Sequence, residues 1–318
     1  MSLLQYLLCT LLALSFTEAY KLDKKFDASN FLNSFEFINT HDKYTGGCAS
    51  YVTKDEAISM GLARTIGSQV YLGVDNNSVV DVTPQGGRKS VRIESHDTID
   101  SGIIVADFEH LPANACGMWP AFWLLHDNEN NGDYYSEIDI VESVSYLTRN
   151  RITLHTNPSQ CTMTAQSGTG DVFSTDCDYD TGGCGVTAPY GTFGDSFNQN
   201  GGGVWATQIE AGGINIWYFA KSAIPADIKS DSPDPSKWGT PVMSFVPQNC
   251  NIRDAWKKMK IIINITFCGE YAGGEAWNDY TECRARTGVA SCNDYVAKTP
   301  SAFDDVYFLI NSIKTYHD

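Results

Sequence analysis

The segment Glu137-Ile138-Asp139-Ile140-Val141-Glu142 alternates carboxylates with branched apolar residues over most of its length. Because successive side chains of a strand point to opposite faces, this pattern predicts a β-strand on which Glu137 and Asp139 share one face. A regular strand would place Val141 on that face and turn Glu142 away from it. We expect a β-bulge, one extra residue near Ile140 and Val141, to bring Glu142 round to the other two carboxylates.

Runs of aromatic and β-branched residues, each bounded by turn residues, recur throughout the chain. They predict strands at 91–95, 102–108, 151–155, 213–220, 260–267 and 305–310. Helix signals are scarce, and 54–62 and 251–256 are the two short candidates. Many short strands with so little helix predict an all-β fold, a sandwich or jelly roll.

The chain has 318 residues, of which 38 are acidic and 22 basic, and its formal net charge is -16. This acidic balance argues against nucleic acid and anionic membrane surfaces as partners, and it is compatible with a neutral polysaccharide. All-β sandwiches often exceed about 200 residues as one domain, so the length gives no reason to divide the chain. No linker or internal repeat marks a second module, and we expect a monomer.

Residues 3–16 form an apolar run followed by Thr17-Glu18-Ala19, which is typical of a secretory signal peptide cleaved after Ala19. The alternative is a membrane anchor, but a spanning helix needs about 20 apolar residues and this run is shorter. We therefore expect residues 1–19 to be a signal peptide and 20–318 to be a single mature domain. The protein is expected to be secreted into the extracellular space, without a membrane span.

Nine cysteines remain after Cys9 leaves with the signal peptide. Their spacing does not resemble a zinc site, and oxidising conditions outside the cell favour disulfides. Because nine is odd, we expect one unpaired thiol, which composition does not identify. Of two N-glycosylation sequons, Asn76-Asn77-Ser78 lies in a polar turn and Asn76 is expected to be modified. The sequon that begins at Asn264 lies in an apolar strand and is expected to be hidden.

Two carboxyl groups that face each other across a sugar linkage are the minimal equipment for glycoside hydrolysis. A retaining enzyme needs them about 5–5.5 Å apart and an inverting one about 6.5–9.5 Å apart. Four strand steps cover about 13 Å, so we expect curvature to bring Glu137 and Glu142 together. Three clustered carboxylates cannot all ionise cheaply, so at least one pKa should rise, as suits a general acid. Taken alone, such a segment is more often a solvated acidic strand without catalysis, because acid-rich hexapeptides are common.

Residues 117–125 carry Trp119 and Trp123, which are four positions apart and so share one face of a strand. Aromatic faces stack on the apolar faces of sugar rings, although core packing is the commoner use of tryptophan and is expected for Trp119. His155 follows an expected hairpin turn at Arg149-Asn150. A strand histidine is more often structural than catalytic, but this one lies close in sequence to the acidic strand.

Together these segments resemble glycoside hydrolase family 16, and among its members the secreted fungal endo-β-1,3(4)-glucanases of laminarinase type. The resemblance is carried by Trp-Pro-Ala-Phe-Trp at 119–123, by the acidic segment and by Leu-His-Thr at 154–156. Weaker matches extend over almost all of the mature chain. The resemblance implies a β-jelly roll of two stacked antiparallel sheets with an open cleft on the concave face. It also implies that no metal or organic cofactor takes part in the chemistry.

The family motif implies that Glu137 is the nucleophile, Glu142 the general acid/base, and Asp139 the residue that orients and tunes the nucleophile. It further implies that Trp123 stacks on a donor-side glucose. Arg92 and His155 match cleft residues of the family.

The sequence departs from the family pattern at two places. The segment 132–136 replaces the usual Trp-Pro-x-x-Gly, so a cleft tryptophan is missing and Tyr134 or Tyr135 would stand in for it. Near the end of the chain, Tyr271 occupies a position where the family has a tryptophan. Both changes alter the walls near the cleaved bond and leave the substrate preference open.

The resemblance implies a retaining endo-β-glucanase that hydrolyses β-1,3 or mixed β-1,3-1,4 glucans by double displacement. One alternative is a transglycosylase on cell-wall glucans, which tyrosines on the acceptor side would favour. Another is a glucan-binding jelly roll without turnover, against which the intact pair Glu137 and Glu142 argues. In every case the expected partner is a β-glucan polysaccharide.

Overall fold

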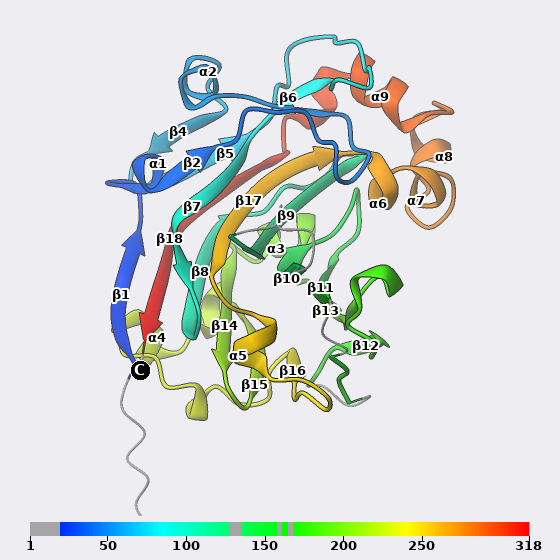
Figure 1. Ribbon diagram of the computed structural model, residues 1–318. Helices are drawn as coiled ribbons and strands as arrows, with labels where there is room; N and C mark the ends of the chain where they lie inside the picture. Colours follow the sequence, from blue (N-terminus) through cyan, green and yellow to red (C-terminus); the bar gives the residue numbers. More distant parts are fainter. Residues whose placement is uncertain (1–19, 128–134, 158–160, 165–167, 318) are drawn as a thin grey trace, which may run out of the picture.

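The structure is a computed structural model that describes residues 20–127, 135–157, 161–164 and 168–317. The predicted signal peptide, Cys9 and Tyr134 lie outside these residues. Two large antiparallel sheets pack face to face and curve together (Figure 1). The predicted all-β jelly-roll sandwich is therefore confirmed. No helix within the described ranges is long and apolar enough to cross a membrane.

The outer sheet has eight strands, and seven of them are hydrogen-bonded in a row. In spatial order these are β16 (Met243–Phe245), β15 (Gly213–Ala220), β14 (Gly203–Glu210), β8 (Gly102–His110), β18 (Tyr307–His317), β5 (Gln69–Gly73) and β4 (Ala63–Ile66). The eighth, β1 (Lys21–Phe26), pairs with the far end of β18. The two ends of the described chain consequently lie side by side (Figure 1).

The inner sheet also has eight strands. Their spatial order is β12 (Asp171–Ser174), β13 (Cys184–Tyr190), β11 (Arg149–Asn157), β10 (Tyr135–Glu142), β9 (Met118–His126), β17 (Met259–Phe267), β7 (Arg92–Ile99) and β2 (Phe35–Phe37). A short parallel pair, β3 (Ala49–Tyr51) with β6 (Arg88–Ser90), lies beside the sandwich. Each of the six predicted strand segments overlaps an observed strand, and 213–220 coincides with β15.

Every helix among the described residues is short. The α-helices are α1 (Phe31–Ser34), α2 (Lys54–Ser59), α3 (Gly194–Gln199), α4 (Ala226–Lys229), α5 (Ile252–Ala255), α6 (Gly269–Ala272), α7 (Gly274–Asn278), α8 (Cys283–Thr287) and α9 (Cys292–Lys298). Single 3-10 turns are η1 (Tyr179–Thr181), η2 (Lys221–Ala223), η3 (Pro235–Lys237) and η4 (Pro300–Phe303). The predicted helices at 54–62 and 251–256 correspond to α2 and α5, whereas the cluster α6–α9 was not predicted.

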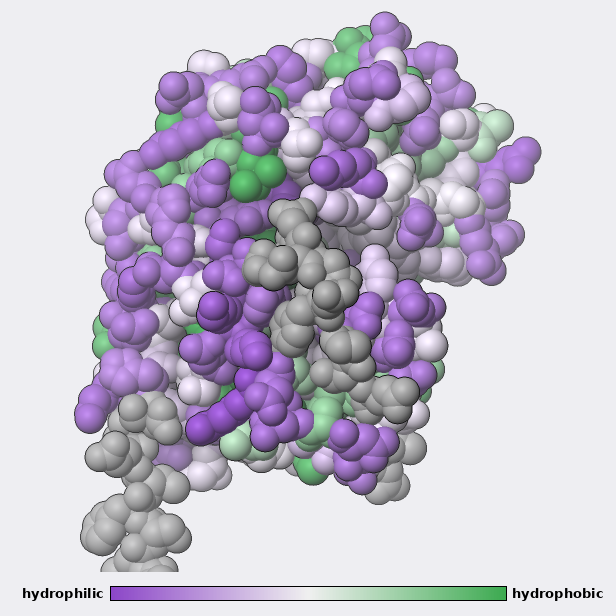
Figure 2. Space-filling view, in the orientation of Figure 1, coloured by the Kyte–Doolittle hydropathy of each residue, from purple (hydrophilic) through white to green (hydrophobic). Residues whose placement is uncertain are grey.

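The sandwich core lies between the two sheets. Phe108 on β8, Phe122 on β9 and Phe308 on β18 are fully buried there. The ring centroids of Phe108 and Phe122 are 5.4 Å apart, and those of Phe108 and Phe308 are 5.8 Å apart. Burying one such side chain contributes roughly 1.5–3 kcal/mol, so contacts of this kind hold the inner sheet against the outer one. Hydrophilic residues cover most of the face seen in Figure 2.

Four disulfides are present, and they leave one of the nine described cysteines unpaired, as predicted. The bonds are Cys116–Cys283, Cys161–Cys250, Cys177–Cys184 and Cys268–Cys292. The first and last of these fasten the helices α6–α9 to the ends of the inner sheet. The unpaired cysteine is Cys48, which is buried beside β3. Burial raises the pKa of its thiol to about 12, so the reactive thiolate is suppressed.

We predict that the folded protein, beginning at Tyr20, does not react with a thiol reagent such as Ellman's reagent. Denaturation without reductant should release one reactive thiol per chain, because Cys48 becomes exposed while the disulfides persist. The variant Cys48→Ser should release none. More than one reactive thiol in the denatured protein would contradict the observed disulfide pairing.

Candidate active site

Strand β10 carries the predicted bulge. On the side of β9, Asp139 faces Trp123 and Val141 faces Phe122, so two steps of β10 match one step of β9. On the side of β11, the three steps from Asp139 to Glu142 match the two steps from 153 to 151. The extra residue brings Glu142 to the face that carries Asp139. The expected bulge is thus confirmed.

The bulge is held by Asn150, a fully buried residue of β11. Its Oδ1 accepts a hydrogen bond from the backbone N–H of Glu142 at 2.9 Å, and its Nδ2 donates to the Ile140 carbonyl at 2.8 Å. A bulge interrupts the ladder of a sheet, and this one carboxamide supplies two of the missing partners. The hydroxyl of Thr192 accepts a hydrogen bond from the backbone N–H of Asn150 at 3.0 Å and so anchors it.

The prediction of a hairpin turn at Arg149-Asn150 was wrong. Both residues belong to β11, and the connection from β10 spans residues 143–148. The strand extends this far because Arg149 pairs with Tyr190 of β13 and because the side chain of Asn150 bonds to β10. These are tertiary contacts, which the local sequence of a turn does not reveal.

The concave face of the inner sheet is hollowed into a cleft of about 860 Å³. Every predicted catalytic and substrate-binding residue lines it, namely Arg92, Trp123, Tyr135, Glu137, Asp139, Glu142, His155 and Tyr271. Trp119 lines it too, so the prediction that Trp119 packs in the core was wrong. Positions 119 and 123 of β9 face the cleft, while Phe122 and its neighbour Leu124 fill the sandwich core.

Glu142 lies in an enclosed part of the cleft next to Trp119. The indole Nε1 of Trp119 donates a hydrogen bond to Glu142 Oε1 at 2.7 Å. The pKa of Glu142 is raised to about 7, chiefly by removal from solvent and also by the charge of Glu137. The Trp119 hydrogen bond and the nearby Arg151 guanidinium act in the opposite direction. Glu142 can therefore both release and recover a proton near neutral pH.

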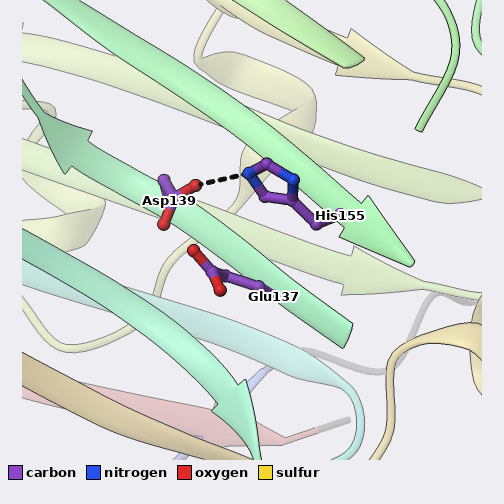
Figure 3. Close-up of side chains that lie close together, drawn as sticks. All are labelled: Glu137, Asp139 and His155. Atoms are coloured by element: carbon purple, nitrogen blue, oxygen red, sulfur yellow. Dashed lines mark ion pairs between the residues drawn. The ribbon is translucent and has the colours of Figure 1, made fainter. Parts of the chain in front are cut away.

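Glu137, Asp139 and His155 lie together on neighbouring strands (Figure 3). Burial raises the pKa of Asp139 well above its usual value, and the charges of Glu137 and Glu142 raise it further. Burial lowers the pKa of His155. Both shifts favour the neutral forms of the two groups, and His155 Nε2 lies 3.3 Å from Asp139 Oδ2. A protonated Asp139 can donate its own hydrogen bond to Glu137 and orient it.

His155 Nδ1 is buried and has no hydrogen-bond partner among the described residues. A neutral imidazole with its proton on Nε2 suits this environment, because the bare Nδ1 then needs no acceptor. The possible ligand atoms of Glu137, Asp139 and His155 lie within 4.8 Å of one another, so these residues could hold a metal ion. The absence of a metal from the chemistry stays a prediction.

The Trp123 side of the cleft contains polar residues that sequence analysis did not assign to the site. Trp123 Nε1 donates to Asn264 Oδ1 at 2.7 Å, and Asn264 Nδ2 donates to the Tyr51 hydroxyl at 3.2 Å. The Arg92 guanidinium lies 5.1 Å from the Trp123 ring centroid and is paired with Glu94 at 2.9 Å. Asn264 is buried, so the expectation that its sequon is hidden is confirmed.

Tyrosines from three segments complete the walls. The hydroxyl of Tyr135 donates a hydrogen bond to Glu137 Oε2, and the Tyr135 ring lies 4.6 Å from that of Tyr179 in η1. Tyr271 in α6 makes an edge contact with Trp119, with ring centroids 5.4 Å apart. Tyr179 and Arg151 are further cleft residues that sequence analysis missed. Arg151 lies four residues before His155 on β11, so strand alternation places both side chains on the cleft face, and this pattern could have identified Arg151 from the sequence.

Comparison with known proteins identifies relatives over nearly the whole chain. A family model described as "XgeA-like, catalytic GH16 domain" matches residues 35–316. The endo-1,3(4)-beta-glucanase xgeA of Emericella nidulans is 38% identical over 302 residues, which are 93% of this chain and 47% of that protein. A probable glycosidase of Schizosaccharomyces pombe is 36% identical over 307 residues, which are 94% of this chain and 70% of that protein. The chain spans about half the length of the curated endoglucanases it matches.

Two solved structures are similar in both fold and sequence. One is an elongating GH family 16 beta-1,3-glucosyltransferase, with a TM-score of 0.84 and 38% identity, covering 94% of this chain and 100% of that one. The other is Laminarinase 16A from Phanerochaete chrysosporium with beta-glucans in its donor and acceptor sites, with a TM-score of 0.84 and 35% identity. It too covers 94% of this chain and 100% of that one.

We predict that Asn150→Leu lowers the free energy of unfolding by roughly 2–6 kcal/mol, because two buried backbone groups lose their partner at about 1–3 kcal/mol each. The measurement is a urea titration. Asn215→Leu is the matched control, since that half-buried carboxamide donates to Gln208 at 3.2 Å and bridges no bulge. Its effect should stay within about 0.5 kcal/mol. Equal losses in the two variants would contradict the role given to Asn150.

Proposed function

The chain belongs to glycoside hydrolase family 16, and we propose that it is a retaining endo-β-glucanase acting on β-1,3 or mixed β-1,3-1,4 glucans. The observation that carries this proposal is the bulge of β10, which sets Glu137, Asp139 and Glu142 on one face of the cleft. The raised pKa of Glu142 supports its role as the general acid.

In the first step Glu142 donates its proton to the glycosidic oxygen while a Glu137 oxygen attacks the anomeric carbon. The bond to the leaving sugar breaks, and a glycosyl ester forms on Glu137. In the second step Glu142, now ionised, takes a proton from water, which displaces Glu137 from the anomeric carbon. Asp139 and Tyr135 donate hydrogen bonds to Glu137 and hold it in position between the two steps.

Glu142 is proposed to mark the boundary between the residues that bind the donor-side sugars and those that bind the leaving sugar. Trp123 would stack on a donor-side glucose, and Arg92 would bind hydroxyls farther along the same side. Tyr271 and Trp119 would flank the leaving sugar next to Glu142. His155 would act through Asp139, since its Nε2 contacts that carboxyl group.

A second candidate function is transfer of the glycosyl unit to another sugar. Similarity to an elongating GH16 β-1,3-glucosyltransferase at 38% identity favours it. Products longer than the starting oligosaccharide would establish transfer. A binding protein without turnover is disfavoured, because it would not need two carboxylates held at the bulge with Glu142 poised to exchange a proton near pH 7.

The protein is further proposed to be secreted as a monomer, with residues 1–19 as its signal peptide and 20–318 as one catalytic domain. Four disulfides support an oxidising destination. Asn76 is the proposed glycan site, and its carboxamide lies at the surface, where it contacts Asp304 at 2.8 Å. Asn264 is not proposed as one, because its carboxamide serves the cleft.

We predict that Glu137→Gln abolishes the release of reducing sugar from laminarin and barley β-glucan, since an amide cannot form the glycosyl ester. Glu142→Gln should lower the rate by about 10²–10⁴-fold, the usual contribution of general acid/base catalysis. Glu36→Gln, an exposed change on β2, is the control and should keep full activity. Equal sugar release by the wild type and Glu137→Gln would refute the proposed mechanism.

The activity should fall as pH rises through about 7, because kcat/KM requires Glu142 to be protonated and its pKa lies near that value. Below that pH Glu142 is protonated, so its titration no longer changes kcat/KM. Trp119→Phe removes a hydrogen bond that favours the ionised form, so it should move the basic limb to higher pH. Trp217→Phe, a change on β15 outside the cleft, should leave the limb in place. An unshifted limb in Trp119→Phe would contradict the assignment of Glu142.

A further inference from the structure

Two arginines line the cleft, and they differ in their partners. Arg92 is bound to Glu94 at 2.9 Å. Arg151 forms no ion pair with any carboxylate in the described ranges of the chain. Its guanidinium instead lies against aromatic rings, 3.8 Å from the Phe173 centroid and 5.7 Å from the Tyr271 centroid. A cation held this way keeps N–H groups free for a ligand.

The position of Phe173 depends on a glycine in the neighbouring strand. Phe173 belongs to β12, and Gly185 of β13 lies between that strand and Arg151. A Cβ atom at Gly185 would come within 2.9 Å of the Phe173 ring. Because Gly185 has no side chain, the ring can reach across β13 to the guanidinium. Phe173 is 37% exposed, so part of the ring remains accessible to solvent.

The register of the inner sheet places Arg151 opposite Glu142, on the side of β10 away from the donor-side residues. Arg151 is the partner of Glu142 across the β10–β11 ladder. Trp123 and Asn264 lie on β9 and β17, on the other side of β10. Glu142 protonates the oxygen of the departing sugar under the proposed function. Arg151 therefore lies with the leaving group, opposite the donor-side stack.

We propose that Arg151, clamped between Phe173 and Tyr271, is a specificity-determining residue that donates hydrogen bonds to the hydroxyls of the leaving sugar. Phe173 extends this subsite across β13 to β12. In a transfer reaction an acceptor sugar would occupy the same place. The ligand is a neutral sugar, because Asp180 and Glu270 also line the cleft and would repel an anionic one. This inference rests on the proposed function.

The test compares two substrates that share the donor side and differ in the leaving group. Laminaripentaose places a sugar beside Arg151, whereas an aryl β-laminaribioside places an aromatic ring there. For Arg151→Met, the ratio of kcat/KM for the pentaose to kcat/KM for the aryl glycoside should fall about 10-fold or more, as expected for lost hydrogen bonds from a charged donor. Transfer to added laminaribiose should fall in parallel.

A charge effect on Glu142 is the main alternative, and Arg151→Lys separates it from binding. Lysine keeps the positive charge but lacks the planar fork that stacks on the rings. The pH profile should then stay close to that of the wild type while the substrate ratio stays low. If Arg151 acts through charge alone, Arg151→Met should change both substrates equally and Arg151→Lys should restore both, which would overturn the inference.

Arg149→Met is the matched control. Arg149 lies two residues earlier on β11 and also covers a ring, with its guanidinium 5.0 Å from the Tyr190 centroid, but it does not line the cleft. Its substrate ratio should change less than about 2-fold, since it touches no leaving group. A wild-type protein inactive on both substrates would refute the proposed function. An active wild type with an unchanged ratio in Arg151→Met would refute this inference alone.

Discussion

The candidate active site depends on one carboxamide that bonds to two backbone groups of a bulged strand. The Asn150 side chain accepts a hydrogen bond from the backbone N–H of Glu142 and donates one to the backbone carbonyl of Ile140. Without Asn150, these two backbone groups would be buried without hydrogen-bond partners. Without the extra residue in β10, side-chain parity would point Glu142 into the sandwich core. The proposed catalytic pair therefore depends on backbone hydrogen bonding at the bulge as well as on the acidic residues themselves.

Once the bulge has gathered three carboxylates, their environment assigns them different protonation states. Asp139 is buried between the other two, so its protonated form is favoured, and that form can donate a hydrogen bond to Glu137. Glu142 is enclosed but receives a hydrogen bond from Trp119, which moderates the effect of burial and leaves its pKa near 7. The clustering of the three carboxylates thus separates the protonation behaviour that the proposed acid and the proposed nucleophile require.

Sequence reasoning succeeded where a local pattern determines the outcome. The parity of Glu142 against Glu137 was sufficient to predict the bulge, and β-branched runs located the strands of both sheets. It failed where contacts between segments distant in sequence determine the structure. Helices α6–α9 span only four to seven residues each, too short for helical periodicity, and disulfides hold them in place. The role of Asn150 was invisible for the same reason, because its partners lie on another strand.

Tyr271 stands where the family has a tryptophan, and the neighbouring Arg151 offers a physical reason for this difference. Burial and the charge of Glu142 raise the pKa of Tyr271, and the positive charge of Arg151, whose guanidinium lies 5.7 Å from the Tyr271 ring centroid, partly offsets that rise. A phenol oxygen can accept a hydrogen bond from a guanidinium, whereas the indole N–H of a tryptophan can only donate one. Tyr271 and Arg151 therefore suit each other, and the loss of a family tryptophan accompanies a differently built wall beside Glu142. In the sequence, Tyr271 looks like the loss of an aromatic surface for sugar binding. In the folded chain, its ring is one of the two that lie against the Arg151 guanidinium.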